Sequence, residues 1–268
     1  MDSKNRRSFI LKEIEERGSV NVAELAVQMH VSEMTIRRDL SDLDGEGIIH
    51  RTHGGAVSAR GRSYEPPLTI RASENLEAKR RMGKTAANLV AEGDSVAIDT
   101  GSTALEVAKN LIEYRNLTVV TSNLYVANLL FNKPGIRLIL SGGTIRQEEA
   151  SLIGKLAELT YQSLFVDRLF LGVGAIDIDT GLTEYNWEDT LIKQAMISSA
   201  KEVILVADST KFNRIAFARV APLNILHQIV TDKPLEAKYA EAFAQLNISV
   251  HISDQIDNPQ LESKSERE

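Results

Sequence analysis

The first 57 residues carry three apolar repeats with the spacing of amphipathic helices. Apolar side chains three or four positions apart lie on one face of a helix. The repeats are Phe9, Ile10, Leu11 and Ile14; Val22, Leu25, Ala26 and Met29; and Ile36, Leu40 and Leu43. Three such stripes can close one small core. Behind them, two apolar pairs flank Gly54-Gly55, which favours the turn of a β-hairpin.

A short turn at His30 and Val31 joins the second and third predicted helices, which is typical of a helix-turn-helix. The face opposite the third apolar stripe carries Met34, Arg38 and Ser41, with Thr35 and Arg37 on its flanks. That face has the size and the donors to enter a DNA major groove, and Arg51 and His53 project from the predicted hairpin wing. The predicted DNA contacts are Ser32, which also caps the helix, Met34, Thr35, Arg37, Arg38, Arg51, His53 and Gly54.

A plainer interpretation of Arg37 and Arg38 is a solvated helix face, paired with Asp39 or Asp42. Residues 1 to 60 contain nine Lys and Arg against ten Asp and Glu, so this module is not basic overall. Any DNA affinity must therefore come from a local patch and from two or more copies of it.

The pattern divides the chain into two domains, the second of which is predicted to have an α/β fold. Residues 1–58 form the predicted winged helix-turn-helix domain. Residues 59–73 lose all periodicity, and Pro66-Pro67 stiffens this stretch into an extended linker. From 74 to 252, short apolar runs alternate with helical patterns, which predicts βαβ units and a mainly parallel sheet. The runs span residues 96–98, 117–120, 136–140, 169–173, 203–206, 229–230 and 248–250. The polar tail 253–268 is expected to be disordered.

Composition narrows the possible chemistry. The chain has 268 residues and a formal net charge of −6, which argues against adhesion of the whole surface to membranes or nucleic acid. It has no cysteine, so disulfides, thiolate catalysis and Cys-ligated zinc are excluded. The five histidines lack metal-ligand spacing, and no signal peptide or membrane-spanning run is present. We expect a cytoplasmic protein with no metal and no cofactor.

Polar segments follow the predicted strands, at the sheet edge where α/β proteins bind ligands. These segments are 99–103, 121–123, 141–144 with Arg146, 172–177 and 208–211. They supply hydroxyls, carboxylates, glycines and two cations, a set suited to a phosphorylated sugar. Each is also ordinary loop and capping chemistry when taken alone. Neither a Walker A loop nor a Gly-x-Gly-x-x-Gly fingerprint is present, and Trp187 suits either sugar stacking or a core anchor.

With both halves in view, residues 5 to 252 resemble the DeoR family of bacterial regulators of sugar metabolism. The resemblance rests on three motifs, which are Val31-Ser32-x-x-Thr35-Ile36-Arg37-Arg38-Asp39-Leu40, the wing Arg51-Thr52-His53-Gly54-Gly55-Ala56, and Asp99-Thr100-Gly101-Ser102-Thr103. It implies a C-terminal domain with a fold like ribose-5-phosphate isomerase and CoA-transferase, which binds a phosphorylated sugar. The implied effector contacts are Asp99, Gly101, Ser102, Thr103, Asn123, Gly143, Arg146, Asp177 and Lys211.

The implied mechanism is a repressor: a homo-oligomer, dimer or tetramer, binds double-stranded operator DNA and is released by the sugar phosphate. An activator with the same DNA-binding mode stays open. The rival class is an enzyme, a sugar-phosphate isomerase or transferase with an appended DNA-binding module, in which Asp99, Asp177 and Lys211 would do acid-base work. Against it, the segment that follows Gly142-Gly143 does not reproduce the lysine and glutamate signature of the isomerases.

Overall fold

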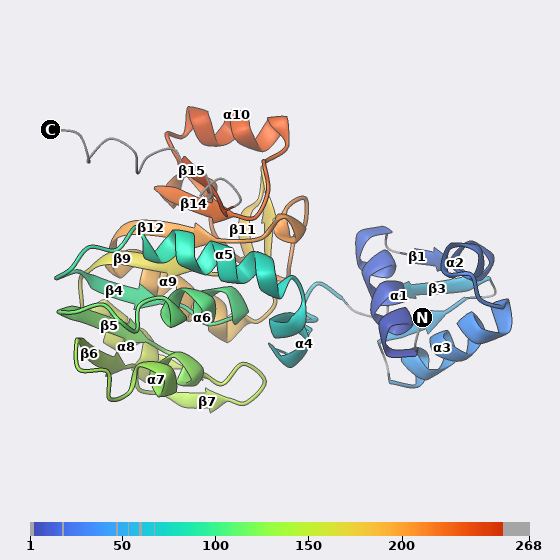
Figure 1. The fold of residues 1–268 in the computed structure, drawn as a ribbon, viewed down its shortest axis with the longest axis horizontal. Coiled ribbons are helices and arrows are strands. Elements are labelled where there is room, and N and C mark those ends of the chain that lie inside the picture. The colour runs from blue at the N-terminus through green and yellow to red at the C-terminus, as the bar shows by residue number, and fades with distance from the viewer. Residues whose placement is uncertain are drawn as a thin grey trace, which may run out of the picture. The chain divides into compact units, whose positions relative to one another are not determined.

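The chain divides between Tyr64 and Glu65 into two compact units in a computed structural model that describes residues 3–17, 19–46, 48–52, 54–58, 61–66 and 68–253 (Figure 1). The predicted wing residue His53 and residues 254–268 of the predicted tail lie outside the described residues. Each unit has its own apolar core. None of the helices in the described ranges is long and apolar enough to cross a membrane.

The first unit contains the three predicted helices and a three-stranded antiparallel sheet of order β1-β3-β2. Its elements are α1 (Ser3–Arg17), β1 (Ser19–Asn21), α2 (Val22–Met29), α3 (Glu33–Gly45), β2 (Ile49–Arg51) and β3 (Gly55–Ser58). Ile10, Ile36, Leu40 and Leu43 are at most 2% exposed, so the predicted stripes do face one core. The helix-turn-helix and the hairpin wing are confirmed.

Strand β1 was not expected, and it gives Gly55 a different role from the predicted turn residue. Gly55 lies on β3, where it pairs with Asn21 of β1. A Cβ at Gly55 would lie 1.8 Å from the carbonyl oxygen of Val20, so only glycine lets the two strands approach this closely. A Cβ at Gly54 would meet nothing within 4 Å.

The second unit is built on a seven-stranded parallel sheet of order β15-β14-β12-β9-β4-β5-β6, which confirms the predicted α/β class. Each predicted apolar run overlaps one strand of this sheet, although the run 169–173 extends two residues beyond β9 and the run 248–250 begins one residue before β15. The strands are β4 (Ser95–Ile98), β5 (Leu117–Thr121), β6 (Ile136–Leu140), β9 (Val166–Leu171), β12 (Ala200–Val206), β14 (Gln228–Thr231) and β15 (Ser249–Ile252).

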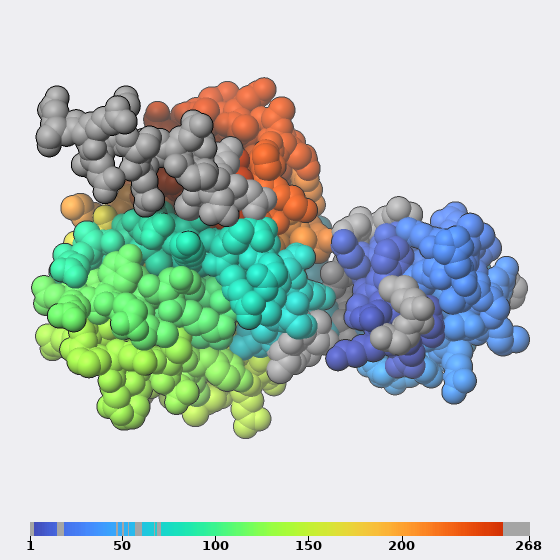
Figure 2. Space-filling model, in the orientation of Figure 1, coloured from blue at the N-terminus to red at the C-terminus, as the bar shows by residue number. Residues whose placement is uncertain are grey.

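Helices cover both faces of the sheet, because the strand side chains that point to either face are apolar. Val96 and Ile98 of β4 join the core with one set of helices, and Ala97 joins the core with the other. Helices α5 (Leu76–Ala87), α6 (Ser102–Lys109) and α7 (Leu124–Leu130) cover the first face, where α5 and α6 form one closed surface (Figure 2). Helices α8 (Lys155–Gln162), α9 (Trp187–Ser199) and α10 (Ala237–Gln245) pack into the second core.

Smaller elements complete the unit. They are the antiparallel sheet β10-β11-β13, the ribbon β7-β8 and two 3-10 turns. Their bounds are β7 (Thr144–Arg146), β8 (Ser151–Ile153), β10 (Ala175–Asp177), β11 (Gly181–Glu184), η1 (Ser209–Lys211), β13 (Ala218–Ala221) and η2 (Leu223–Ile225).

The segment predicted as an extended linker is partly helical. Residues 68–73 form α4 (Leu68–Ser73), and Arg71 of this helix donates from its Nε to the carbonyl oxygen of Pro66 at 2.9 Å. Two prolines in sequence indicate an extended connector, but ion pairs of the largely covered side chains of Arg71 and Glu65 hold this stretch within the second unit.

Candidate DNA-binding and effector sites

Helix α3 presents the face that the sequence predicts for groove binding. Ser32 caps the helix as expected, because its Oγ accepts from the amide of Thr35 at 3.2 Å. Ser32 Oγ and Thr35 Oγ1 also lie 2.9 Å apart. Met34 is 75% exposed, and Arg38 and Ser41 are exposed beside it. The helix therefore begins at a fixed point and leaves an uncovered polar face with one apolar side chain.

Two aspartates of α3, Asp39 and Asp42, are held by α1, which leaves the arginines of α3 to other partners. Arg6 meets the buried Asp39 through two nitrogens, with Nε to Oδ2 at 2.5 Å and Nη2 to Oδ1 at 3.1 Å, and Arg7 pairs with Asp42. Arg37 forms an exposed pair with Glu33 at 3.2 Å. Arg38 makes no ion pair with any described residue. The pairs with Asp39 and Asp42 that the plainer interpretation names are therefore absent among the described residues, whereas the solvated helix face that it expects is present for Arg37, which pairs with Glu33.

The wing residues are exposed where they are described. The amide of Arg51 donates to Asp44 Oδ1 at 3.2 Å, which ties strand β2 to the end of α3, and the Arg51 side chain is exposed. Gly54 is also exposed, and its carbonyl oxygen accepts from the amide of Val22 at 2.9 Å. The backbone of the wing is thus fixed to both helices of the motif.

Asp99, at the carboxyl end of β4, belongs to a buried ion cluster. Its Oδ2 accepts from Lys193 Nζ at 2.5 Å and from the amide of Gly172 at 2.9 Å. Lys193 also lies 3.3 Å from Glu184 Oε2 and donates to the carbonyl oxygen of Gly172 at 3.1 Å. The exposed fractions of the three charged side chains are 1% for Asp99, 4% for Lys193 and 6% for Glu184. Burial raises the pKa of Asp99, while the Lys193 ammonium opposes that shift.

Arg71 lies beside the N-terminus of α6, and two lysines, Lys79 and Lys211, are charged neighbours of this region. Gly101 precedes the helix with φ 106°, and a Cβ there would lie 3.9 Å from Nη1 of Arg71. Lys79 is buried beside Arg71, since its Nζ donates to the carbonyl oxygen of Arg71 at 2.5 Å. Burial lowers the pKa of Lys79, and the charge of Lys211 lowers it further, whereas Asp208 opposes the shift. The Lys211 ammonium makes no hydrogen bond or ion pair with any described residue.

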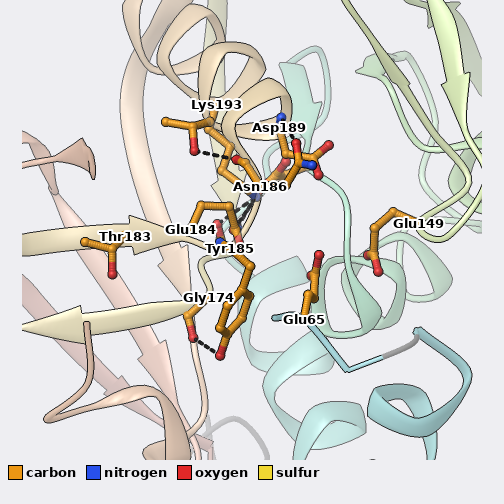
Figure 3. A network of polar contacts seen from close by, with 12 residues as sticks. Glu65, Glu149, Gly174, Thr183, Glu184, Tyr185, Asn186, Asp189 and Lys193 are labelled. Atoms are coloured by element: carbon orange, nitrogen blue, oxygen red, sulfur yellow. Dashed lines mark hydrogen bonds and ion pairs between the residues drawn. The ribbon is translucent and has the colours of Figure 1, made fainter. Parts of the chain in front are cut away.

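A second charged network joins α4 to the β7-β8 ribbon and α9. The carboxylate of Glu65 bridges two arginines, with Oε1 at 3.0 Å from Arg71 Nη2 and Oε2 at 3.0 Å from Arg146 Nη2. Arg71 also pairs with Glu149, and Arg146 with Asp189. Figure 3 shows Asp189 and Lys193 on α9 near Glu184, with Glu65 and Glu149 opposite. Burial raises the pKa of all three outer carboxylates, Glu65, Glu149 and Asp189.

The structure brings some of the predicted effector residues together and gives others a local role. Asn123 is the N-cap of α7, where its Oδ1 accepts from the amide of Tyr125 at 2.8 Å. Gly143 has φ 124°, and a Cβ there would lie 2.3 Å from the carbonyl oxygen of Ile153. Asp177 accepts from the amide of Thr180 at 2.8 Å in the turn between β10 and β11. Its contacts are with this turn, and the network of Asp99 does not include it.

The predicted residues that share the sheet edge are Asp99, Gly101, Ser102, Thr103 and Arg146, with Lys211 near Lys79. Sequence reasoning missed Glu65, Arg71, Lys79 and Lys193. For Lys193 a signal exists, because it stands four positions after Asp189 on the buried stripe of α9. Trp187 opens the same helix and is 55% exposed. Within the described ranges no group of three or more His, Cys, Asp and Glu side chains could hold a metal ion.

Comparison with known proteins matches both units. A model described as the DeoR-like helix-turn-helix domain matches residues 6–61, and one described as the DeoR C terminal sensor domain matches residues 74–233. The chain is 33% identical over 253 residues to the glycerol-3-phosphate regulon repressor of Escherichia coli (strain K12), which covers 94% of this chain and 100% of that relative.

A second relative is the transcriptional repressor AccR of Agrobacterium fabrum, 34% identical over 231 residues, which cover 86% of this chain and 90% of AccR. Among solved structures, ribose 5-phosphate isomerase A from Methanocaldococcus jannaschii overlaps 52% of this chain and 55% of its own, at 19% identity and a TM-score of 0.39. That overlap is too small to bear on function. The two family models and the near full-length relatives agree, and the chain belongs to the DeoR family.

Proposed function

We propose that this protein is a transcriptional repressor that binds operator DNA through α3 and its wing and leaves it when a phosphorylated sugar binds. The observation that carries the DNA-binding part is the free face of α3. Its backbone is fixed by the Ser32 cap and by the buried Arg6–Asp39 pair, while Arg38 stays without an ion-pair partner among the described residues. A rigid helix with an unpaired guanidinium suits direct reading of a guanine edge in the major groove.

The predicted effector site is the carboxyl edge of the sheet beside the N-terminus of α6. Free backbone amides at a helix start attract anions, and here Arg71 lies beside them, with Lys79 next to Arg71 and Lys211 close enough to affect the pKa of Lys79. The lowered pKa of Lys79 means that its buried ammonium is destabilised, and a bound phosphate would reverse this. One relative is named for a glycerol-3-phosphate regulon, which fits a small phosphorylated polyol or sugar as the effector class.

Release requires that the effector binds one conformation more tightly than the other. Coupling of this kind between two sites is typically about 1 to 3 kcal/mol. We propose that a homo-oligomer, a dimer or a tetramer, presents paired recognition helices to a repeated operator, because one winged helix with no excess of basic residues binds DNA weakly. The effector then favours an arrangement in which the paired helices no longer match the operator spacing.

The chain is a regulator rather than an enzyme, as its named relatives are repressors. The cluster around Asp99 agrees with this. A general base needs a carboxylate that can reach the substrate, and Asp99 is 1% exposed and already holds Lys193 and the amide of Gly172.

The test is selection of genomic fragments by the immobilised full-length protein, followed by challenge with a panel of sugar and polyol phosphates. We expect one repeated site, released by one compound or a few related ones. Recovery of no discrete site would refute the DNA-binding proposal, and a site that no phosphorylated compound releases would refute the effector class. Turnover of ribose 5-phosphate by the same preparation, measured in parallel, would restore the enzyme hypothesis.

A further inference from the structure

The first two described residues of the second unit, Glu65 and Pro66, form a short stretch that we call the connecting segment. It follows directly after Tyr64, the last residue of the DNA-binding unit. Arg71 holds both residues of the segment, donating from Nε to the Pro66 carbonyl oxygen at 2.9 Å and contacting Glu65 Oε1 at 3.0 Å. Arg146 contacts the other oxygen, Glu65 Oε2, at 3.0 Å. Two arginines thus fix the point where the chain enters the sensor unit.

The same two arginines stand at the predicted effector site. Arg71 approaches Gly101 at the start of α6, and Arg146 reaches Asp189 at the start of α9. Their side chains are 13% and 14% exposed, and the Glu65 side chain is 11% exposed. An anion that enters this site would therefore meet guanidinium groups whose donors are already occupied by carboxylates of the protein itself.

Among those carboxylates, Glu65 is the one that contacts both arginines. Asp189 contacts Arg146 and Ser151 Oγ from helix α9, and Glu149 contacts Arg71 from the loop between β7 and β8. The Glu65 carboxylate contacts only the two arginines in the described part of the chain. Burial raises its pKa, as it does for Glu149 and Asp189, because the charged forms are desolvated. Glu65 is thus the carboxylate whose displacement by an anion frees donors on both guanidinium groups and also releases the connecting segment.

We propose that Glu65 occupies the effector's anion subsite as an internal competitor, and that the phosphate group displaces it from Arg71 and Arg146. This inference rests on the proposed function and deepens it. Displacement of Glu65 frees the connecting segment, so that the point of attachment of the DNA-binding unit is no longer fixed. The anion cannot bind while Glu65 fixes the connecting segment. It therefore binds more tightly to the conformation in which the segment is free, and this is the difference in affinity that release from DNA requires.

The test compares the wild-type full chain with Glu65→Gln, which keeps the size of the side chain and removes its charge. Glu148→Gln is the matched control, because Glu148 is a 71% exposed carboxylate at 3.9 Å from Nε of Arg146. Inorganic phosphate is the probe, titrated by calorimetry at constant ionic strength. Hydrogen exchange of the peptide spanning residues 61–75 reports on the connecting segment. If Glu65→Gln does not fold, Glu65→Asp replaces it, since the shorter side chain cannot bridge both arginines.

We expect Glu65→Gln to bind phosphate at least about fivefold more tightly than the wild type and the control, in line with typical coupling between sites. Its 61–75 peptide should exchange fast without phosphate, whereas the wild-type peptide should become fast only when phosphate is added. Equal phosphate affinity in all three proteins, no binding in any, or an unchanged exchange rate in the wild type would overturn the inference. Release of the wild type from its operator by a sugar phosphate would still stand in each of those cases, so the two proposals fail separately.

Discussion

Replacement of Lys193 by methionine tests the buried charge cluster most sharply. The ammonium lies 2.5 Å from Asp99 Oδ2 and 3.3 Å from Glu184 Oε2, and all three side chains are at most 6% exposed. Methionine fills similar space but leaves two carboxylates buried without their cation. Loss of one partner from a buried ion pair costs about 3 to 5 kcal/mol. For a unit of this size, that loss lowers the unfolding midpoint by about 6 to 20 °C at 2 to 4 °C per kcal/mol.

The assay uses the one tryptophan of the chain. Trp187 is the first residue of α9, so its fluorescence during urea or thermal unfolding reports on the sensor unit rather than on the DNA-binding unit. The matched control is Lys155→Met. Lys155 is 66% exposed and pairs with Glu158, so its replacement should lower the free energy of unfolding by less than about 1 kcal/mol. Adding Asp99→Asn to Lys193→Met should recover about 1 to 3 kcal/mol, since one buried charge is then removed.

A loss below about 1 kcal/mol for Lys193→Met, equal to that of the control, would refute the reasoning. It would mean that the two carboxylates are hydrated or protonated without cost when the lysine is absent, and that the cluster is not a closed interior site.

Three further predictions concern separate parts of the molecule. Arg38→Ala should weaken operator binding by about 1 to 3 kcal/mol at fixed salt, with phosphate binding unchanged, and equal operator affinity would remove Arg38 from the DNA contacts. Gly55→Ala should cost about 1 to 3 kcal/mol of stability in the first unit, because its Cβ would collide with the Val20 carbonyl, whereas Gly54→Ala should be nearly neutral; equal effects would contradict the close approach. Hydrogen bonds from Ser95 lower the pKa of Asp167 from its ordinary value of 3.8. Ionised Asp167 therefore stabilises the fold at pH values above 3.8, and this stabilisation is lost as the pH falls through the lowered pKa. Asp167→Asn should therefore lower the thermal midpoint at pH 7 and converge with the wild type in acid, and a constant gap would refute this.

The main sheet could be predicted because each of its strands is buried on both faces and therefore reads as a short apolar run. Phe170 and Leu171 illustrate this, since they are adjacent and face different cores, and both are fully buried. The ribbon β7-β8 and the sheet β10-β11-β13 were not predicted, because their strands are only three or four residues long, too short for a periodic pattern to stand out. Strand β1 was missed for a related reason: its three residues include one partly buried apolar side chain.

The sequence predicts a candidate site at the carboxyl edge of the sheet, but it does not predict the long-range partners of the residues there. Polar residues after strands indicate this edge, and Asp99 and Gly101 lie there, directly after β4. Whether such a residue is free or already satisfied depends on residues far away in sequence, as with Asp99 and Lys193, which are separated by 94 positions. Asp177 also lies in a polar segment after an apolar run, but it is the last residue of β10 and accepts a hydrogen bond within the hairpin turn that follows.

The segment predicted as a linker is a second example of a feature that the local sequence does not reveal. Pro66 and the lack of periodicity indicated an extended connector, and nothing local shows that Glu65 would bridge Arg71 to Arg146, 81 positions away. Long-range ion pairs of this kind leave no period in the sequence. They nevertheless decide which segments belong to the sensor unit.

The central claim is that effector binding and operator binding are coupled through this chain, and a reciprocal titration tests it most directly. Operator affinity of the full-length protein is measured by fluorescence anisotropy with and without a saturating sugar phosphate, at fixed salt. Effector affinity is then measured for the free protein and for the operator complex. The two ratios must be equal, and we expect both to lie at about 5- to 150-fold. An effector that binds the protein but changes operator affinity by no measurable factor would contradict the account.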